Sequence, residues 1–175
     1  MIVNIELKAR GPVPGLNIGP REMNSVIRET WIDVGTYWFV HFRGKHFTKQ
    51  GAAEYGYAPR RGERMVESRA KGWAGTYTGR KFLEHHHTRP LVLTGETEAG
   101  SRGATIRGFA TRNASRVEIA IGAPKLNFHI NRSRVDPAKE MRTISEREKR
   151  ILREQFESHF DRRVDAFRST TVIVI

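Results

Sequence analysis

The alternation of apolar and polar residues at the start of the chain predicts a β-strand. Over residues 2–8 the apolar side chains at Val3, Ile5 and Leu7 fall on one face, and polar residues separate them. A period of two is typical of a strand with one face on a core and the other in solvent. Gly11 and the prolines that follow it interrupt this pattern, so we expect the strand to end before them.

The same period returns in the second half of the chain. Residues 105–110, 117–121 and 126–130 each alternate, which predicts a meander of strands. Gly108 indicates a bulge or a close approach of another backbone within the first of these strands. Asn113 lies where a hairpin turn is expected. Residues 169–175 are apolar on both faces, so we predict a terminal strand that pairs inside the sheet or against a neighbouring chain.

Two segments have the apolar spacing of amphipathic helices. Between Pro20 and Phe42, bulky apolar residues recur at steps of three or four, and a second such stripe runs from Leu152 to Phe167. Proline is tolerated in a first helical turn, so Pro20 suits the start of the first helix. Thr143 with Glu146, or Ser145 with Glu148, has the spacing of a capping box, which predicts the start of the second helix.

Together these elements predict an α+β fold within one domain, residues 1–175. We expect a mainly antiparallel β-sheet, two long amphipathic helices packed on one of its faces, and an extended basic loop arm at about 44–88. A chain of 175 residues, 38% of them hydrophobic, is long enough to bury a core. It has no cysteine and no apolar stretch of membrane-spanning length, so we expect a soluble intracellular protein without disulfides.

Residues 44–88 differ from the rest in composition. Aliphatic residues are sparse and glycines frequent, while aromatic residues alternate with arginines. Such a mixture stacks on nucleic-acid bases or covers a neighbouring subunit, and we favour the subunit because the segment has too few aliphatics for a core of its own. The candidate interface or DNA-facing residues are Arg60, Arg61, Arg64, Arg69, Lys71, Trp73, Tyr77, Arg102, Arg107 and Arg112.

The positive charge is concentrated in the middle of the chain. The formal charge is +12, and residues 43–134 hold eighteen lysines and arginines against seven acids. Such a region attracts phosphates or an acidic protein surface. A soluble face rich in arginine is the simpler alternative.

We predict no metal, cofactor or catalytic site. His85, His86 and His87 are adjacent, but on a strand only two of them share a face, whereas zinc requires three or four convergent ligands. The nucleophile-elbow, zinc-protease and phosphate-loop patterns are missing from the sequence. We therefore expect a protein that is not an enzyme.

The order of the predicted elements and of several short motifs resembles that of a known protein family. An apolar run over 89–100, interpreted as a strand-to-turn junction, contains the pattern Pro-Leu-x-x-Thr-Gly from Pro90 to Gly95. Asp-Pro-Ala follows the meander at 136–138, and the second helix opens with Ile-Ser-Glu-x-Glu at 144–148. With the preceding strand, helix and basic segment, this order resembles the tailed-phage virion morphogenesis proteins of the tail-completion or neck type.

The resemblance implies a structural virion protein of the phage neck, either a tail-completion or tail-terminator subunit or a head-tail connector subunit. It implies a homo-oligomeric ring around the DNA channel, with a hexamer favoured over a dodecamer. The partners would be other neck, connector and tail proteins, with non-specific contact to DNA and no membrane. Such a protein is assembled in the host cytoplasm and ends in the virion. The alternative from the residues alone is a sequence-independent nucleic-acid-binding protein that uses the basic region 43–134.

Overall fold

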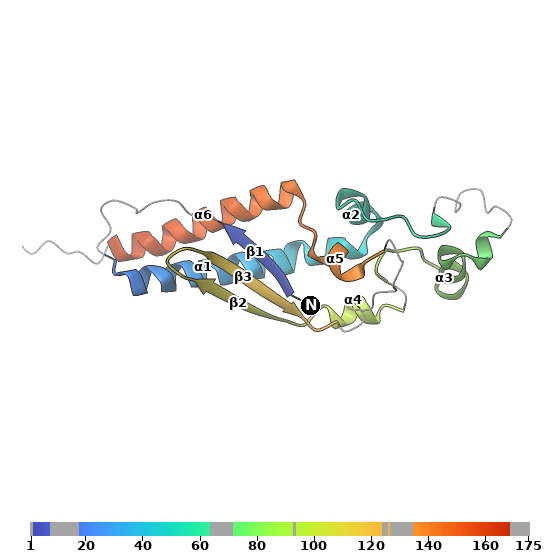
Figure 1. Cartoon of the computed structure of the whole chain (residues 1–175), viewed down its shortest axis with the longest axis horizontal. Helices are drawn as coiled ribbons and strands as arrows, with labels where there is room; N and C mark the ends of the chain where they lie inside the picture. The colour runs from blue at the N-terminus through green and yellow to red at the C-terminus, as the bar shows by residue number, and fades with distance from the viewer. Residues whose placement is uncertain are drawn as a thin grey trace, which may run out of the picture. The chain divides into compact units, whose positions relative to one another are not determined.

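The computed structural model describes residues 2–7, 18–63, 72–92, 94–123, 126 and 135–168. These residues form two compact units. We call residues 2–40, 105–120 and 146–168 the sheet unit, and residues 41–104 and 121–145 the helical unit. Figure 1 labels the helices and strands of both. Helix and strand are mixed, so the fold is α+β.

The sheet has three strands in the order β1-β3-β2. They are β1 (Ile2–Leu7), β2 (Ala104–Ala110) and β3 (Ser115–Ile121), in the segments where alternation predicts them. β1 pairs antiparallel with β3, with Val3 opposite Ile119. Val3, Val117 and Ile119 are almost fully buried, so the apolar face of the alternating pattern is the core face.

The hairpin between β2 and β3 turns at the predicted place. The backbone N–H of Thr111 donates to the carbonyl of Ala114 at 2.8 Å, and the Thr111 hydroxyl donates to the same carbonyl. Asn113 lies inside this turn, where a short polar residue is favoured. The four-residue turn brings β2 beside β3 in the sheet.

Helix α1 (Pro20–His41) contains the aromatic stripe of the first predicted helix. Trp31, Val34 and Trp38 are completely buried. A Cβ built on Gly35 would lie 2.6 Å from a methyl group of Val117, so only glycine allows α1 to come this close to the sheet. A Cβ on Gly108 would lie 2.1 Å from the carbonyl oxygen of Arg28, which confirms a close backbone approach.

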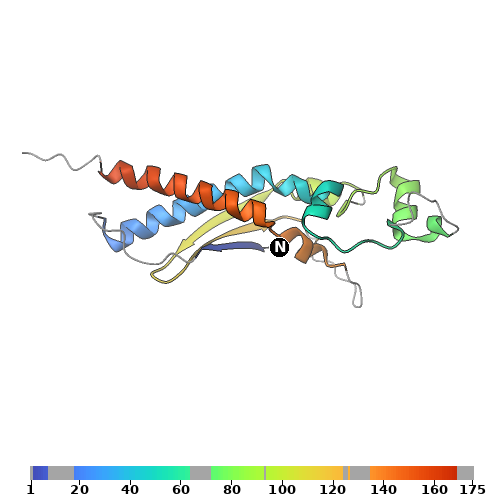
Figure 2. The ribbon, with the colours of Figure 1, turned by 90° about the horizontal axis from the view of Figure 1, so that it is seen from above.

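Helix α6 (Glu146–Arg168) is the second predicted helix. Leu152 and Val164 of its apolar stripe are buried. The rings of Phe156 and Trp31 lie 4.9 Å apart between centroids, which places α6 against α1. Figures 1 and 2 show these two helices running along each other beside the strands. The Arg163 guanidinium adds a 2.5 Å ion pair to Asp33 of α1.

Short helices make up much of the described part of residues 44–88, where the sequence predicts an extended loop arm. They are η1 (Arg43–Phe47), α2 (Lys49–Glu54), η3 (Trp73–Gly75) and α3 (Tyr77–His85). Thr48 and Thr76 cap α2 and α3, since each hydroxyl accepts a hydrogen bond from the N–H three residues later. The expectation of an extended arm was wrong for these helical residues. It was based on the many glycines and did not take the two helix caps into account.

The helical unit also has a core, which the scarcity of aliphatic residues had argued against. Its residues 46, 47, 55 and 73 are all buried, and three of them are aromatic. Val92, Leu126 and Met141 add aliphatic surface from later in the chain. The unit therefore obtains its core from aromatic rings and from distant segments, so the composition of 44–88 alone underestimated it.

Two local interpretations are corrected. In the described part of 89–100, residues 90 and 91 form a turn and helix α4 (Glu96–Gly100) follows, rather than a strand end, and Gly95 before α4 has φ 87°. His85 ends α3 and His86 has φ 55°, so the three histidines lie at a helix terminus rather than on a strand.

After Asp136, whose carboxylate accepts from the Lys139 N–H at 3.0 Å, the chain forms helix α5 (Pro137–Arg142).

Some predictions lie outside the described residues. They are the strand over 126–130, of which only Leu126 is described, and the strand over 169–175.

Candidate functional site

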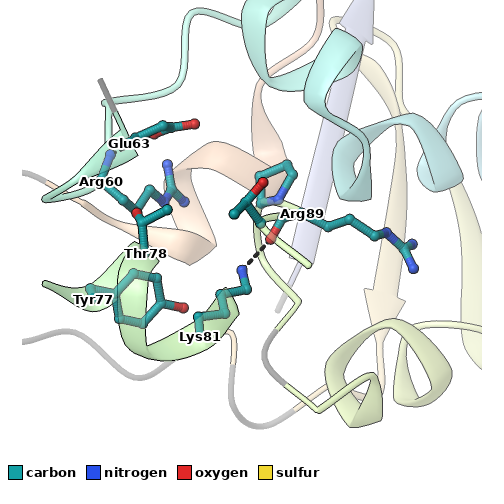
Figure 3. Close-up of a pocket in the computed structure, with 8 residues that line it drawn as sticks. Arg60, Glu63, Tyr77, Thr78, Lys81 and Arg89 are labelled. Atoms are coloured by element: carbon teal, nitrogen blue, oxygen red, sulfur yellow. Dashed lines mark hydrogen bonds between the residues drawn. The ribbon is translucent and has the colours of Figure 1, made fainter. Parts of the chain in front are cut away.

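A shallow, open pocket with a volume of about 10 Å³, enough for a single water molecule, lies within the helical unit. Helix α3 supplies Tyr77, Thr78 and Lys81 to it (Figure 3). Arg60 and Glu63 line a second side, and Thr88, Arg89 and Pro90 complete the lining.

Backbone contacts around Gly79 hold α3 in place. The Thr76 hydroxyl accepts from the Gly79 N–H at 3.1 Å and caps the helix. A Cβ on Gly79 would lie 2.0 Å from the carbonyl oxygen of Trp73, so a larger residue would push α3 away from η3. The Trp73 indole N–H donates to the carbonyl of Gly62 at 3.1 Å. This bond ties the base of α3 to the segment that carries Arg60.

Arg60 is held by an ion pair within the unit. Its Nη1 donates to Oε1 of Glu140 at 2.9 Å and its Nη2 to Oε2 at 2.5 Å. The two side chains are only 12% and 8% exposed. Nη1 also donates to the carbonyl of Ala58, and the Glu63 carboxylate accepts from the Arg60 backbone N–H at 2.7 Å. The planar guanidinium therefore has a fixed orientation beside the pocket.

Lys81 is the buried cation of the pocket. The residue is 4% exposed, and its ammonium group donates a hydrogen bond to the carbonyl of Arg89. Burial lowers the pKa of Lys81 to about 8, and the neighbouring charges of Arg60 and Arg89 act in the same direction, against Glu63. The ammonium group also lies 5.5 Å from the ring centre of Tyr77, whose own pKa burial raises. The pocket thus offers hydrogen-bond donors and positive charge.

A second polar cluster surrounds His46 in the same unit. The His46 ring stacks on Tyr55 with centroids 4.1 Å apart, and its Nδ1 hydrogen-bonds with the hydroxyl of Tyr57. That hydroxyl also contacts the carbonyl oxygen of Glu140 at 3.0 Å. Burial lowers the pKa of His46 to about 3, so the ring is neutral at physiological pH.

The structure separates the sequence-predicted site residues into groups. Trp73 is buried, so it serves packing rather than an exposed interface, and Arg60 is bound to Glu140. Tyr77 is 41% exposed at the pocket. Of these candidates, four arginines are exposed, two in each unit: Arg61, Arg102, Arg107 and Arg112. Arg64, Arg69 and Lys71 lie outside the described residues.

The sequence reasoning missed Lys81, Glu140 and His46. For Lys81, the local signal was the helix cap at Thr76. The cap predicts a short helix on which Lys81 follows Tyr77 by four positions, about one turn. Glu140 follows Arg60 by 80 positions, and a single sequence carries no signal for a pairing at that separation.

Four large apolar side chains of the described residues are exposed. Ile32 and Val40 of α1 are 36% and 65% exposed, and the exposed Thr36 lies between them on the same helix face. Tyr77 and Leu83 of α3 are 41% and 56% exposed, with the exposed Arg80 between them. We call Ile32, Thr36 and Val40 the α1 surface, and Tyr77, Arg80 and Leu83 the α3 surface.

Neither a metal centre nor a membrane span emerges from the described part of the chain. No group of three or more metal-binding side chains converges in the ranges that the structure describes. No helix there is long and apolar enough to cross a membrane.

Comparison with known proteins gives no match: no family model, no curated protein and no solved structure is significantly similar to this chain.

Proposed function

We propose that this protein is a structural subunit of the tailed-phage neck, a ring-forming tail-completion, tail-terminator or connector protein. The motif order from Pro90 to Glu148 suggests the family. The structure supports assembly independently of that resemblance, through the exposed apolar side chains of the α1 surface and the α3 surface.

The observation that carries the proposal is the presence, on one chain, of two different surfaces with exposed apolar side chains. The α1 surface belongs to the sheet unit and the α3 surface to the helical unit. A ring closes by heterologous contacts, in which one surface of each subunit binds a different surface of the next. Apolar side chains such as Val40 and Leu83 favour such contacts, because each Å² of apolar surface removed from water stabilises the contact by about 25 cal/mol.

In the proposed subunit, α1 and α6 cover one face of the sheet. The contact of Gly35 with Val117 and the packing of Phe156 on Trp31 support this arrangement. The other face then keeps polar side chains such as Arg107, which is exposed on β2. In a ring of such subunits, the polar face of the sheet and the α1 and α3 surfaces would contact different neighbouring proteins.

The remaining parts of the proposal follow from the family resemblance. The ring has six subunits in preference to twelve, contacts other neck, connector and tail proteins, and surrounds the channel through which DNA passes. It acts structurally in the virion, without catalysis or a cofactor, after assembly in the host cytoplasm.

The mass of the purified protein in solution tests the proposal. We expect native mass spectrometry and light scattering to give one closed species, with six copies favoured over twelve. Val40→Asp should reduce the mass to that of small species, because a carboxylate cannot be buried in the contact without a partner. Ser158→Asp on the exposed side of α6 is the matched control and should assemble normally. A monomer for the unmodified protein at all concentrations, alone and with neck proteins, would contradict the proposal.

The exposed arginines favour a second candidate, a sequence-independent nucleic-acid-binding protein. Arg61, Arg102, Arg107 and Arg112 are all accessible to a phosphate backbone. A monomer that binds unrelated duplexes with equal affinity would favour this candidate over the ring.

A further inference from the structure

The two faces of the sheet differ in what covers them. Gly108 of β2 and Val117 of β3 both touch α1, and Figure 2 shows α6 on the same side of the strands. Successive residues of a strand point to opposite faces, so Phe109 and Arg116 belong to the other face. Arg107 on that face is exposed, so this part of the sheet is open to solvent.

The Phe109 ring and the Arg116 guanidinium form a pair on the open face. The guanidinium carbon lies 5.0 Å from the centre of the ring. Glu118 fixes the guanidinium, since its Oε1 accepts a hydrogen bond from Nε at 3.0 Å. The Arg116 side chain is 42% exposed, and Phe109 is half-buried. Unpaired nucleic-acid bases stack on flat groups of these two kinds, aromatic rings and guanidinium planes.

Positive charge surrounds this pair on β2 and the hairpin. Residues 105–117 contain Arg107, Arg112 and Arg116 and no acid. Arg116 has a carboxylate partner, but neither Arg107 nor Arg112 has an ion pair in the part of the chain that the structure describes. Arg107 lies two positions before Phe109, and hence on the same face of β2. Phosphates on either side of a stacked base would therefore meet exposed guanidinium groups.

We propose that the open face around Phe109 and Arg116 binds single-stranded nucleic acid, which runs along β2 toward the hairpin. A base stacks on the Phe109–Arg116 pair, and Arg107 and Arg112 contact the phosphates beside it. A duplex suits this surface less well, because its bases are stacked on one another and present no free face to a side chain. The site goes beyond the proposed neck function and does not depend on ring formation.

Fluorescence anisotropy of a labelled oligonucleotide of mixed sequence tests the site with the full-length protein. We expect the single strand, as DNA or as RNA, to bind more tightly than the duplex of the same sequence at equal salt. Phe109→Leu keeps an apolar side chain but removes the ring, and should weaken single-strand binding about 5-fold or more, the loss of one stacked base. Phe109→Tyr keeps the ring and should bind as tightly as the unmodified protein. Neither variant should change the affinity for the duplex.

The salt dependence of single-strand binding tests the phosphate contacts. Arg107→Gln should reduce the slope of log affinity against log salt by about 0.7, the value for one phosphate of a single strand. Arg150→Gln, at an exposed position of α6 in the same unit, is the matched control and should leave the slope unchanged.

Ultraviolet cross-linking of the unmodified protein to the single strand locates the contact without a substitution. Trypsin cleaves after Arg107 and Arg112, so Phe109 lies in the peptide of residues 108–112. We expect mass spectrometry to find this peptide with the added mass of a nucleotide. Cross-links confined to other peptides would overturn the proposal.

The binding results separate the possible ligands of the open face. Equal affinities for single strand and duplex, with no effect of Phe109→Leu, overturn the proposal and leave the arginines as a general field for phosphates. Failure of the folded protein to bind the single strand also overturns it, and would assign the face to an acidic protein surface.

Discussion

Arg60 and Glu140 are 80 positions apart in the chain, yet they form a bidentate ion pair in the helical unit. Both side chains are nearly buried. The pair joins the segment after α2 to helix α5, so it links parts of the unit that are far apart in the sequence. This role differs from that of the exposed interface arginine that the sequence predicts.

Glu140→Gln should destabilise the protein strongly. The substitution leaves the buried guanidinium without a counter-charge, and breaking a buried pair in this way costs about 3–5 kcal/mol. Urea unfolding measures the loss. Glu146→Gln removes one partner of the exposed Glu146–Lys149 pair and should have little effect. Equal stability of the two variants would contradict the structural role of Arg60.

Acid should destabilise the protein through His46. Its pKa in the folded state is about 3, below its ordinary value near 6.5, so the unfolded chain binds the additional proton first. The free energy of unfolding should therefore fall as the pH drops from about 6.5 toward 3, by up to ~1.4 kcal/mol per pH unit.

His46→Phe should flatten this part of the pH profile, because phenylalanine keeps the stacking on Tyr55 but does not titrate. The variant is compared with unmodified protein by chemical unfolding between pH 4 and pH 7. His86→Asn, at an exposed position with φ 55° that asparagine tolerates, is the control and should keep the original profile. Parallel profiles for His46→Phe and the unmodified protein would show that His46 does not set the acid sensitivity.

Gly108→Ala should destabilise the sheet unit. The added methyl group would lie 2.1 Å from the carbonyl oxygen of Arg28, which is backbone and cannot rotate away. Overpacking of this kind costs about 1–3 kcal/mol. Thermal unfolding measures the effect, and Gly44→Ala, where no atom lies within 4 Å of the added Cβ, is the control. A melting temperature for Gly108→Ala at or above that of the unmodified protein would be the contrary result.

Regular periodicity made the sheet unit predictable. Val3, Val117 and Trp38 each lie on the face that the local spacing assigns to the core, and that spacing depends only on near neighbours in the sequence. Gly108 and Asn113 were also interpreted correctly, because a close approach and a tight turn each favour particular residue types.

The helical unit was less predictable because distant contacts determine it. The caps at Thr48 and Thr76 were visible in the sequence, but a short helix has too little periodicity to stand out among glycines. The pocket could not be predicted, because it depends on the position of Lys81 relative to Arg60, which the tertiary structure determines. Of the candidate residues, Trp73 was wrongly placed on the surface because an aromatic among arginines suits both an interface and a core.

Binding to DNA should be a screened electrostatic effect without sequence preference. We expect the affinity for two unrelated duplexes to be equal and to fall with salt, with a slope of about −0.9 per neutralised phosphate. Substitution of Arg107 and Arg112 by Gln should reduce the affinity for both duplexes and lower the slope, whereas the exposed Arg150→Gln on α6 should do neither. A preference for one duplex that survives high salt would contradict this prediction and the nucleic-acid alternative with it.

Self-assembly through two different surfaces is the central claim, and mixing two defective variants tests it most directly. Val40→Asp removes the α1 surface and Leu83→Asp removes the α3 surface, so each variant alone should remain a monomer. In an equimolar mixture, the intact α3 surface of the first binds the intact α1 surface of the second. Native mass spectrometry should then find a heterodimer that does not grow, beside a closed ring for the unmodified protein. Full rings from either variant alone, or no heterodimer in the mixture, would contradict the account.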